Sequence, residues 1–238
     1  MNTVRYLPFA SRTGAGNMAV DDAMLQSAAD NNVASLRFYT WNEPTLSLGY
    51  FQPAAERQRD LAWVRRATGG AAIVHDPATE ITYSFALPPG KDWQPSGESW
   101  ICRMHYAIRD ALETFGVKSR AVICGEEQKL APVLCFQHQT AGDLLVKGKK
   151  VAGSAQRKGK GALLQHGSIL FKQSPFAPSV PGILELAGVP VNPQEFIGAV
   201  LKQLEWKFEP GDWTSEELAA MAKIENEKYS SDEWNGKR

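Results

Sequence analysis

The sequence predicts an α+β domain in which helices flank a mixed or antiparallel sheet. Helical and strand-like segments occur in roughly equal proportion and are intermixed along the chain. Between residues 143 and 170, apolar residues recur with a period near two and glycines mark the breaks, which indicates consecutive antiparallel strands. With 238 residues, 43% of them hydrophobic, the chain can bury one large core, so we expect a single domain over residues 1–238.

Composition and charge exclude several classes of protein. The 26 basic and 26 acidic residues give a formal net charge of zero, so no global field recruits nucleic acid or an anionic membrane. The first residues show neither a long apolar segment nor a cleavage pattern, and no apolar run approaches transmembrane length. The cysteines are odd in number and lack metal-like spacing, which favours reduced thiols in a cytoplasmic protein: Cys102, Cys124 and Cys135.

The first 61 residues predict three strands and two helices. Asn17 is expected to cap the first helix. Asp21 and Asp22 then lie near its positive end, where acidic residues usually act as partners of the helix dipole, so we interpret them as such rather than as metal ligands. The expected order is a strand at 4–7, a helix at 18–29, a strand at 35–40, a strand at 44–52 that breaks at a glycine, and a short helix at 56–61.

Residues 65–87 predict a β-hairpin whose first strand opens on two arginines and a glycine pair. Adjacent glycines, Gly69 and Gly70, allow backbone N–H groups to point at an anion or an acyl carbonyl. A β-bulge at a sheet edge is the alternative explanation of this pair. His75, taken alone, is more often a structural histidine than a catalytic one.

The remaining segments complete the expected domain. Residues 99–115 have the spacing of an amphipathic helix that stops at Gly116. Thr214 and Glu217 form a capping box at the start of the last helix. The other expected elements are a strand at 117–123, a polar loop at 126–131, a helix at 193–204, a strand at 206–208 and the last helix at 214–228.

The segment 135–170 has the features of a functional site. A basic turn at 147–150 leads into a strand whose residues 153–155 are Gly, Ser and Ala. Small residues in mid-strand pack poorly and suit a place where the backbone approaches a bound group. Cys135, just before this strand, and Lys150, entering it, are therefore candidates for chemistry.

Several motifs carry a resemblance to a known family. The chain contains RRATGGAAIVHD, then ITYSF, then GKKVAGSAQRKGKGALLQHGSIL. These motifs, in this order, resemble the lipoate–protein ligase and octanoyltransferase family, which shares its catalytic fold with biotin–protein ligases. The resemblance runs from PTLSLGYFQ to the terminal KYSSDEW. It implies a catalytic domain of the biotin/lipoate protein ligase type without an accessory C-terminal domain, in a cytoplasmic enzyme of lipoate biosynthesis and protein lipoylation.

Two branches of this family differ in their chemistry. Ligases make an acyl-adenylate with Mg-ATP, whereas octanoyltransferases move an acyl group from a thioester through a cysteine and need no cofactor or metal. The chain resembles the transferases in Pro53, in QHGSIL and in the CF pair at Cys135, 15 residues before Lys150. Ala71 breaks the triple glycine of the ligases, but Asp143 stands where ligases use an aspartate with Mg-ATP. We therefore expect a transferase and keep the ligase as the alternative.

The resemblance also implies the roles of individual residues. Cys135 would carry the acyl group as a thioester, and Lys150 would face the acyl carbonyl. Separately from the resemblance, the chemistry needs a base for the acceptor amine, and His75 and His138 are the candidates, between which the sequence does not decide. The expected acyl-binding residues are Arg66, Gly69, Gly70, Ala71, His75, Gly153, Ser154, Ala155, His166 and Gly167.

Elementary chemistry supports these roles. A thiolate is a strong nucleophile, and exchange between thioesters is nearly isoenergetic. Cationic lysines in the neighbouring turn favour the thiolate form of Cys135. The ammonium group of Lys150 would stabilise the oxyanion, a type of contact worth about 3 kcal/mol of barrier.

The same reasoning predicts the partners. The donor would be an acyl carrier protein with an octanoyl or lipoyl group, and the acceptor a lipoyl-domain protein such as glycine cleavage H protein. Both partners are commonly acidic, so the basic turn at 147–150 would attract them. We expect the enzyme to be a monomer. A non-catalytic protein that binds lipoate or an acyl group is a further alternative; its mark would be loss of the lysine, and Lys150 is present.

Overall fold

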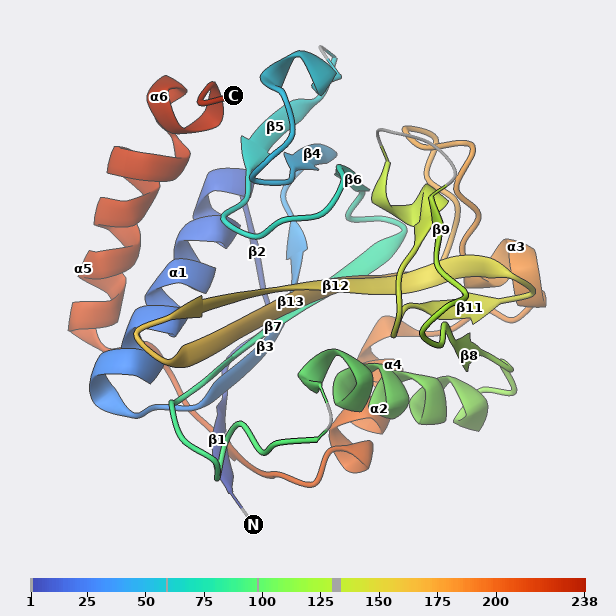
Figure 1. The fold of residues 1–238 in the computed structure, drawn as a ribbon, viewed down its shortest axis with the longest axis horizontal. Helices are drawn as coiled ribbons and strands as arrows, with labels where there is room; N and C mark the ends of the chain where they lie inside the picture. The colour runs from blue at the N-terminus through green and yellow to red at the C-terminus, as the bar shows by residue number, and fades with distance from the viewer. Residues whose placement is uncertain (1, 59, 98, 130–133) are drawn as a thin grey trace.

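A twisted nine-stranded sheet forms the centre of the computed structural model, which describes residues 2–58, 60–97, 99–129 and 134–238 (Figure 1). Four long antiparallel strands make the middle of this sheet, in the order β3 (Ser35–Trp41), β7 (Glu80–Leu87), β13 (Ala162–Leu170) and β12 (Lys149–Gly159). Parallel and antiparallel strands extend it on either side: β1 (Thr3–Tyr6), β2 (Ala10–Arg12), β14 (Lys207–Pro210), β11 (Leu144–Val146) and β8 (Arg120–Ala121).

The chain between β3 and β7 forms a second sheet of three strands. Its central strand β4 (Thr45–Leu48) pairs parallel with β5 (Ala62–Arg65) and antiparallel with β6 (Ile73–His75). A short antiparallel pair, β9 (Gln128–Lys129) and β10 (His138–Gln139), lies in the segment that leads to β11. The nine-stranded sheet and the three-stranded sheet both contribute residues to the cavity described below.

Helices cover both faces of the large sheet (Figure 1). On β7, Tyr83 and Phe85 belong to a core cluster with Met104, whereas Ala86 belongs to a second cluster with Met24. This alternation is expected for a strand buried on both faces. The helices are α1 (Gly14–Asn31) and α5 (Ser215–Ile224) on one face, α2 (Trp100–Thr114) and α4 (Pro193–Gln203) on the other, and the short α3 (Ile183–Ala187) and α6 (Asp232–Asn235).

Short helical turns occur at three further places. Two are 3₁₀ turns, at Ala54–Glu56 and Cys135–Gln137, and the third is a π-helical turn at Glu225–Tyr229 that follows α5. No helix in the described ranges combines the length and apolar composition that a membrane span requires. The mixed sheet with flanking helices confirms the predicted fold class.

Several element predictions are confirmed. The hairpin of β12 and β13 has the period-two pattern expected from the sequence, with Gly153 paired to Ser168. Helix α2 starts after Ser99, whose side chain accepts a hydrogen bond from Ile101 N. Helix α5 begins with the predicted capping box, in which Thr214 accepts from Glu217 N.

Other element predictions are wrong. Helix α1 begins earlier than expected and is capped by Thr13, whose Oγ1 accepts from Gly16 N, so Asn17 is not the cap. The helix expected at 56–61 is not formed by its described residues, because the 3₁₀ turn ends at Glu56; residue 59 lies outside the described residues. The strand expected at 117–123 is limited to β8, and the loop expected at 126–131 contains β9; its residues 130 and 131 lie outside the described residues.

The segment 65–87 is not a hairpin. Strand β6 pairs with β4 in the small sheet, whereas β7 pairs with β3 and β13 in the large one. Asp76 forms the turn between them, because its carbonyl oxygen accepts from the N–H groups of Thr79 and Glu80. The two strands therefore belong to different sheets, and the turn between them carries the chain from the small sheet to the large one.

Candidate active site

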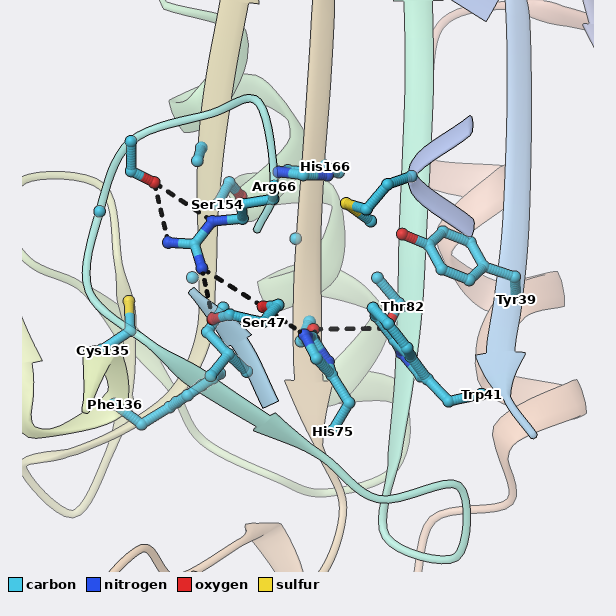
Figure 2. Close-up of a pocket in the computed structure, with 18 residues that line it drawn as sticks. Tyr39, Trp41, Ser47, Arg66, His75, Thr82, Cys135, Phe136, Ser154 and His166 are labelled. Carbon is cyan, nitrogen blue, oxygen red and sulfur yellow. Dashed lines mark hydrogen bonds between the residues drawn. The ribbon is translucent and has the colours of Figure 1, made fainter. Parts of the chain in front are cut away.

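A cavity lies between the two sheets (Figure 2). In Figure 2, Cys135 and Phe136 lie at one side of this cavity and Tyr39 and Trp41 at the other. Predicted site residues form much of its wall: Arg66, Gly69, Gly70, His75, Cys135, Gly153, Ser154, Ala155, His166 and Gly167. The remaining lining residues were not predicted: Met18, Tyr39, Trp41, Ser47, Ile73, Thr82, Phe136 and Ser168. We call this space the acyl cavity.

Cys135 is held beside the start of β6. It begins a 3₁₀ turn, and its N–H donates to Ala72 O at 2.7 Å. The preceding residue, Leu134, forms a parallel bridge with Ala72. The thiol is partly exposed, and its sulfur lies 3.5 Å from Lys150 Nζ. The structure thus brings together the two residues predicted to be catalytic.

Lys150 does not line the acyl cavity but lies directly behind its wall. Its Nζ contacts Asp143 Oδ2 at 2.7 Å, and both side chains are only 2% exposed. Burial lowers the pKa of Lys150, but the charges of Cys135 and Asp143 and their hydrogen bonds outweigh this and raise it above its ordinary value. Lys150 is therefore a cation at neutral pH. Thr140 donates its N–H and its hydroxyl to the same carboxylate oxygen, which fixes Asp143.

Gly153 leaves room for the side chain of this lysine. A Cβ at Gly153 would lie 2.4 Å from Lys150 Cε and 2.8 Å from Nζ. Gly167, beside it on β13, would bring a Cβ to 2.5 Å from Gly153 O. The small residues of the central strand therefore do allow a close approach, as the sequence indicated. At Gly153 the approaching group is the side chain of Lys150, which belongs to the protein itself.

Arg66 holds the glycine loop in place. Its buried guanidinium donates to the carbonyl oxygens of Gly69, Ala71 and Ser47 at 2.7–2.9 Å. Ala71 does not line the cavity and contributes this carbonyl instead. Burial lowers the pKa of Arg66 to about 10, against the opposing effect of the charge of Cys135. Arg66 thus brings a second cation to the region of the thiol while it fixes the backbone of the loop.

The glycine loop also needs the glycine of the LSLGY motif. A Cβ at Gly49 would lie 1.8 Å from Gly70 O, so any side chain there would displace the loop. Gly70 itself has a φ of 92°, in the left-handed region that favours glycine. The expected bulge or anion-binding loop is therefore a tight loop that lies against the end of β4.

Two buried histidines face the acyl cavity, and each has a carboxylate partner. His75 places Nδ1 2.7 Å from Glu80 Oε1 and Nε2 2.8 Å from Ser47 Oγ, and its ring stacks on Trp41. Because a carboxylate accepts a hydrogen bond, the proton of the neutral ring lies on Nδ1 and Nε2 accepts from the serine. The ring of His75 is therefore fixed in orientation.

His166 is held by one residue from α1 and one from the loop that follows β5. Its Nδ1 lies 2.8 Å from Asp21 Oδ2, and its Nε2 lies 2.7 Å from Thr68 Oγ1. Asp21 also pairs with Arg37 at 2.6 Å. The interpretation of Asp21 as a helix-dipole partner is therefore wrong. Its contacts are with Arg37 and His166, 16 and 145 positions away, and nothing in the local sequence indicates them.

Ser154 connects the cavity wall to a second buried network. Its Oγ lies 2.6 Å from Tyr83 Oη and forms a short hydrogen bond with His105 Nε2. His105 is fully buried on α2, and its Nδ1 faces Gly142 O. Burial lowers the pKa of His105, so the ring is neutral. His105 was not singled out in the sequence, because a histidine on a core-facing helix has no distinguishing local pattern.

The last predicted residues lie away from the acyl cavity. His138 is partly buried on β10 and does not line the cavity. Cys102 is partly exposed on α2, and Cys124 is exposed. In the described part of the chain, no group of three or more His, Cys, Asp or Glu residues is arranged to hold a metal ion. Asp143, the residue considered for Mg-ATP, uses its carboxylate to bind Lys150 and Thr140.

Solved structures confirm the fold. A lipoate-protein ligase A bound with ATP superposes with a TM-score of 0.78 at 23% identity, with 99% of each chain covered. The bi-partite lipoate protein ligase from Thermoplasma acidophilum, solved in a study with its E2 lipoyl domain, gives a TM-score of 0.75 at 22% identity. The alignment with the latter covers 99% of this chain and 97% of that chain.

Sequence relatives define the family. The octanoyltransferase LipM of Brevibacillus brevis is 34% identical over the full length of both chains. The octanoyltransferase LipM of Bacillus subtilis is 31% identical, with 99% of each chain covered. The model of the lipoyl protein ligase A/B catalytic domain matches residues 13–205. The resemblance drawn from the motifs is thus confirmed, and the chain is an enzyme that belongs to the family of the lipoyl protein ligase A/B catalytic domain.

Proposed function

We propose that this enzyme transfers an octanoyl group from a thioester donor, through Cys135, to a lysine of a lipoyl-domain protein. The observation that carries the proposal is the contact of 3.5 Å between Cys135 Sγ and Lys150 Nζ at the acyl cavity. A nucleophile, a cation and a space for an acyl chain are thereby joined in one place. The names of the full-length relatives, which are octanoyltransferases, support the choice of octanoyl.

In the first half-reaction, the Cys135 thiolate attacks the carbonyl carbon of the donor thioester. A carbon–sulfur bond to Cys135 forms, the bond to the donor sulfur breaks, and the donor leaves as a thiolate that takes up a proton. Lys150 and Arg66 both place positive charge near the sulfur of Cys135. The exchange conserves the thioester energy, so no ATP is needed.

In the second half-reaction, the neutral amine of the acceptor lysine attacks the thioester on Cys135. A carbon–nitrogen bond forms, the bond to Cys135 Sγ breaks, and the proton lost by the amine leaves through a base. Of the two histidines considered for this role, His75 lines the acyl cavity and His138 does not. The ring of His75 is oriented by Glu80, and its Nε2 reaches the cavity through Ser47.

Lys150 stabilises the oxyanion in both steps. Its charge is assured by Asp143, and its position is fixed because the side chain is confined by Asp143 and by Gly153. A preorganised donor of this kind is worth about 3 kcal/mol of barrier. The acceptor class is supported by the solved ligase that was studied with its E2 lipoyl domain.

Intact-mass spectrometry with octanoyl carrier protein tests the proposal. Without ATP, the enzyme should gain the mass of one octanoyl group, which hydroxylamine should remove as it does from a thioester. Cys135→Ser should lose this adduct or keep a slow ester, whereas Cys102→Ser and Cys124→Ser should form it normally, because neither residue lines the acyl cavity.

Two results would overturn the proposal. Transfer that requires octanoate or lipoate with Mg-ATP and survives Cys135→Ala would establish the ligase reaction. Tight binding of the acyl group without transfer to any lipoyl domain would establish a binding protein. In the ligase case, Asp143→Asn would be the informative variant, since its carboxylate would have to leave Lys150 to act on Mg-ATP.

A further inference from the structure

A second cavity lies next to the Cys135–Lys150 pair and has no assigned role. Phe136 lines both cavities, and Lys150, which lines the second, contacts the sulfur of Cys135, which lines the first. The reactive pair therefore lies where the two spaces adjoin. The second cavity is lined by Gln128, Phe136, Gln137, Gln139, Gly148, Lys149, Lys150, Ser179, Val180 and Pro181. We call it the glutamine cavity.

The lining of the glutamine cavity differs in chemistry from that of the acyl cavity. Three side-chain amides and one hydroxyl line it, and a carboxamide both donates and accepts hydrogen bonds. Gln139 donates through Nε2 to Gly148 O at 3.0 Å, and Gln137 donates through Nε2 to Ser179 Oγ at 3.1 Å. Within the described chain no hydrogen bond to their amide oxygens is found, so these oxygens can accept from the N–H groups of a ligand.

The charge of the glutamine cavity selects among ligands. Its two ionisable residues are Lys149, which is exposed, and Lys150, which is buried. A cationic acceptor lysine would meet repulsion there, whereas a phosphorylated or acidic donor would be attracted. The donor sulfur must also lie beside Cys135 when the acyl chain occupies the acyl cavity, so the rest of the donor needs a separate path.

We propose that the glutamine cavity binds the pantetheine-type arm of the thioester donor. The amide groups of this arm would contact Gln137 and Gln139, and its phosphate would lie near Lys149. This assignment rests on the proposed octanoyl transfer and specifies the donor of that reaction. The same arm occurs in coenzyme A thioesters and in acyl carrier proteins, so the cavity recognises the chemistry that both donors share.

Donors of graded length test the assignment. Acylation of Cys135 would be followed by rapid-quench intact mass with octanoyl-pantetheine and with octanoyl-N-acetylcysteamine, which keeps the thioester and one amide but lacks the outer part of the arm. Gln137→Leu and Gln139→Leu should each raise KM for octanoyl-pantetheine roughly three- to tenfold, the effect of one lost hydrogen bond. In the same variants, the increase in KM for octanoyl-N-acetylcysteamine should be smaller than the increase in KM for octanoyl-pantetheine.

Matched measurements separate binding from damage to the fold. Gln194→Leu, an exposed glutamine at the start of α4, should leave every KM unchanged. Thermal unfolding identifies a variant that is misfolded; Gln139 also supports the turn at Gly148, so Gln137→Leu remains as the independent probe. The KM increase should appear with octanoyl-coenzyme A and with octanoyl carrier protein alike, since both present the same arm.

Three outcomes would overturn the assignment. An unchanged KM for octanoyl-pantetheine in both variants would remove the glutamines from donor binding. Equal KM increases for the full and truncated donors would mean that the amides act on the thioester itself. Slower transfer from preformed octanoyl-Cys135 enzyme to the lipoyl domain, with normal acylation, would assign the glutamine cavity to the acceptor. In each case wild-type octanoylation would still occur; its complete absence with all donors would instead refute the proposed function.

Discussion

Asp143 and Lys150 form an ion pair that is closed to solvent, with 2.7 Å between Oδ2 and Nζ. A pair of this kind contributes little net stability, because the cost of removing both charges from water offsets their attraction. Its role here is to hold the ammonium group of Lys150 in position. The carboxylate fixes the ammonium group 3.5 Å from Cys135 Sγ and keeps it charged.

Lys150→Met is the direct test of this pair. Acyl transfer should fall about 10²- to 10³-fold, because one oxyanion donor is lost. Urea unfolding should show a loss of about 3 kcal/mol, since Asp143 is left as an uncompensated buried charge. The double variant Lys150→Met/Asp143→Leu should regain most of the stability and none of the activity. An active Lys150→Met enzyme would contradict the role of the lysine.

Asp21 should make the stability of the protein depend on acid pH. Burial raises the pKa of Asp21, but the charge of Arg37 and the hydrogen bond from His166 outweigh this, so its pKa lies below the ordinary 3.8. A folded-state pKa below that of the unfolded chain gives stability that is present above about pH 3.8 and is lost as the pH falls through the lower, folded value.

Asp21→Asn tests this linkage. At neutral pH the variant should lose about 3 kcal/mol, because Arg37 remains buried without its counter-ion. Urea unfolding from roughly pH 7 to pH 2 should show the difference from wild type shrinking below about pH 4, as the wild-type carboxylate is protonated. A difference that stays constant over the whole range would show that the stabilising charge belongs to another residue.

Gly49→Ala should disrupt the glycine loop from outside the cavity. The new Cβ would lie 1.8 Å from Gly70 O, so the loop must move. Overpacking of this kind costs about 1–3 kcal/mol, and acylation of Cys135 should slow with it. The control is Gly198→Ala on α4, where no atom lies within 4 Å of the new Cβ and stability should rise by about 0.5–1 kcal/mol. Equal effects of the two substitutions would remove the close contact from the explanation.

Two buried tyrosine hydroxyls differ in their partners and should respond oppositely to removal. Tyr39 Oη is buried and has no hydrogen-bond partner among the residues that the structure describes, whereas Tyr83 Oη contacts Ser154 and Gln165. Tyr39→Phe removes an unsatisfied group and should stabilise the protein by about 1 kcal/mol. Tyr83→Phe leaves the amide donor of Gln165 without an acceptor, while Ser154 keeps its bond to His105, and should destabilise the protein by about 1–3 kcal/mol. Differential scanning calorimetry of both variants would decide, and a loss of stability in Tyr39→Phe would show that its hydroxyl has a partner.

Local patterns predicted the parts of the structure that depend on local forces. The β12–β13 hairpin follows from period-two alternation, and the start of α5 follows from the capping box of Thr214 and Glu217. The Cys135–Lys150 contact was reached through the motif resemblance, because no local pattern relates a 3₁₀ turn to a strand 15 residues later.

Long-range partners escaped prediction for a physical reason. Asp21 is defined by Arg37 and His166, which reach it only after β3 and β13 have been placed in one sheet. The segment 65–87 looked like a hairpin because its two strands alternate properly, but alternation does not specify the partner strand. The partners of β7 follow from its burial: β7 is buried along its whole length and therefore belongs at the centre of the large sheet.

The separation of the reactive pair from the far side of the acyl cavity has a practical consequence for protein labelling. Lys150 is anchored behind the wall by Asp143, while Tyr39 and Trp41 lie across the cavity from Cys135 (Figure 2). Trp41 stacks on His75, so under the proposed function Tyr39 is the residue at this end that can be exchanged without altering Cys135, Lys150 or the contact that orients the proposed base. Enlarging the cavity at Tyr39 would turn the scaffold into a tool for attaching azide- or alkyne-tipped acyl groups to a chosen lysine.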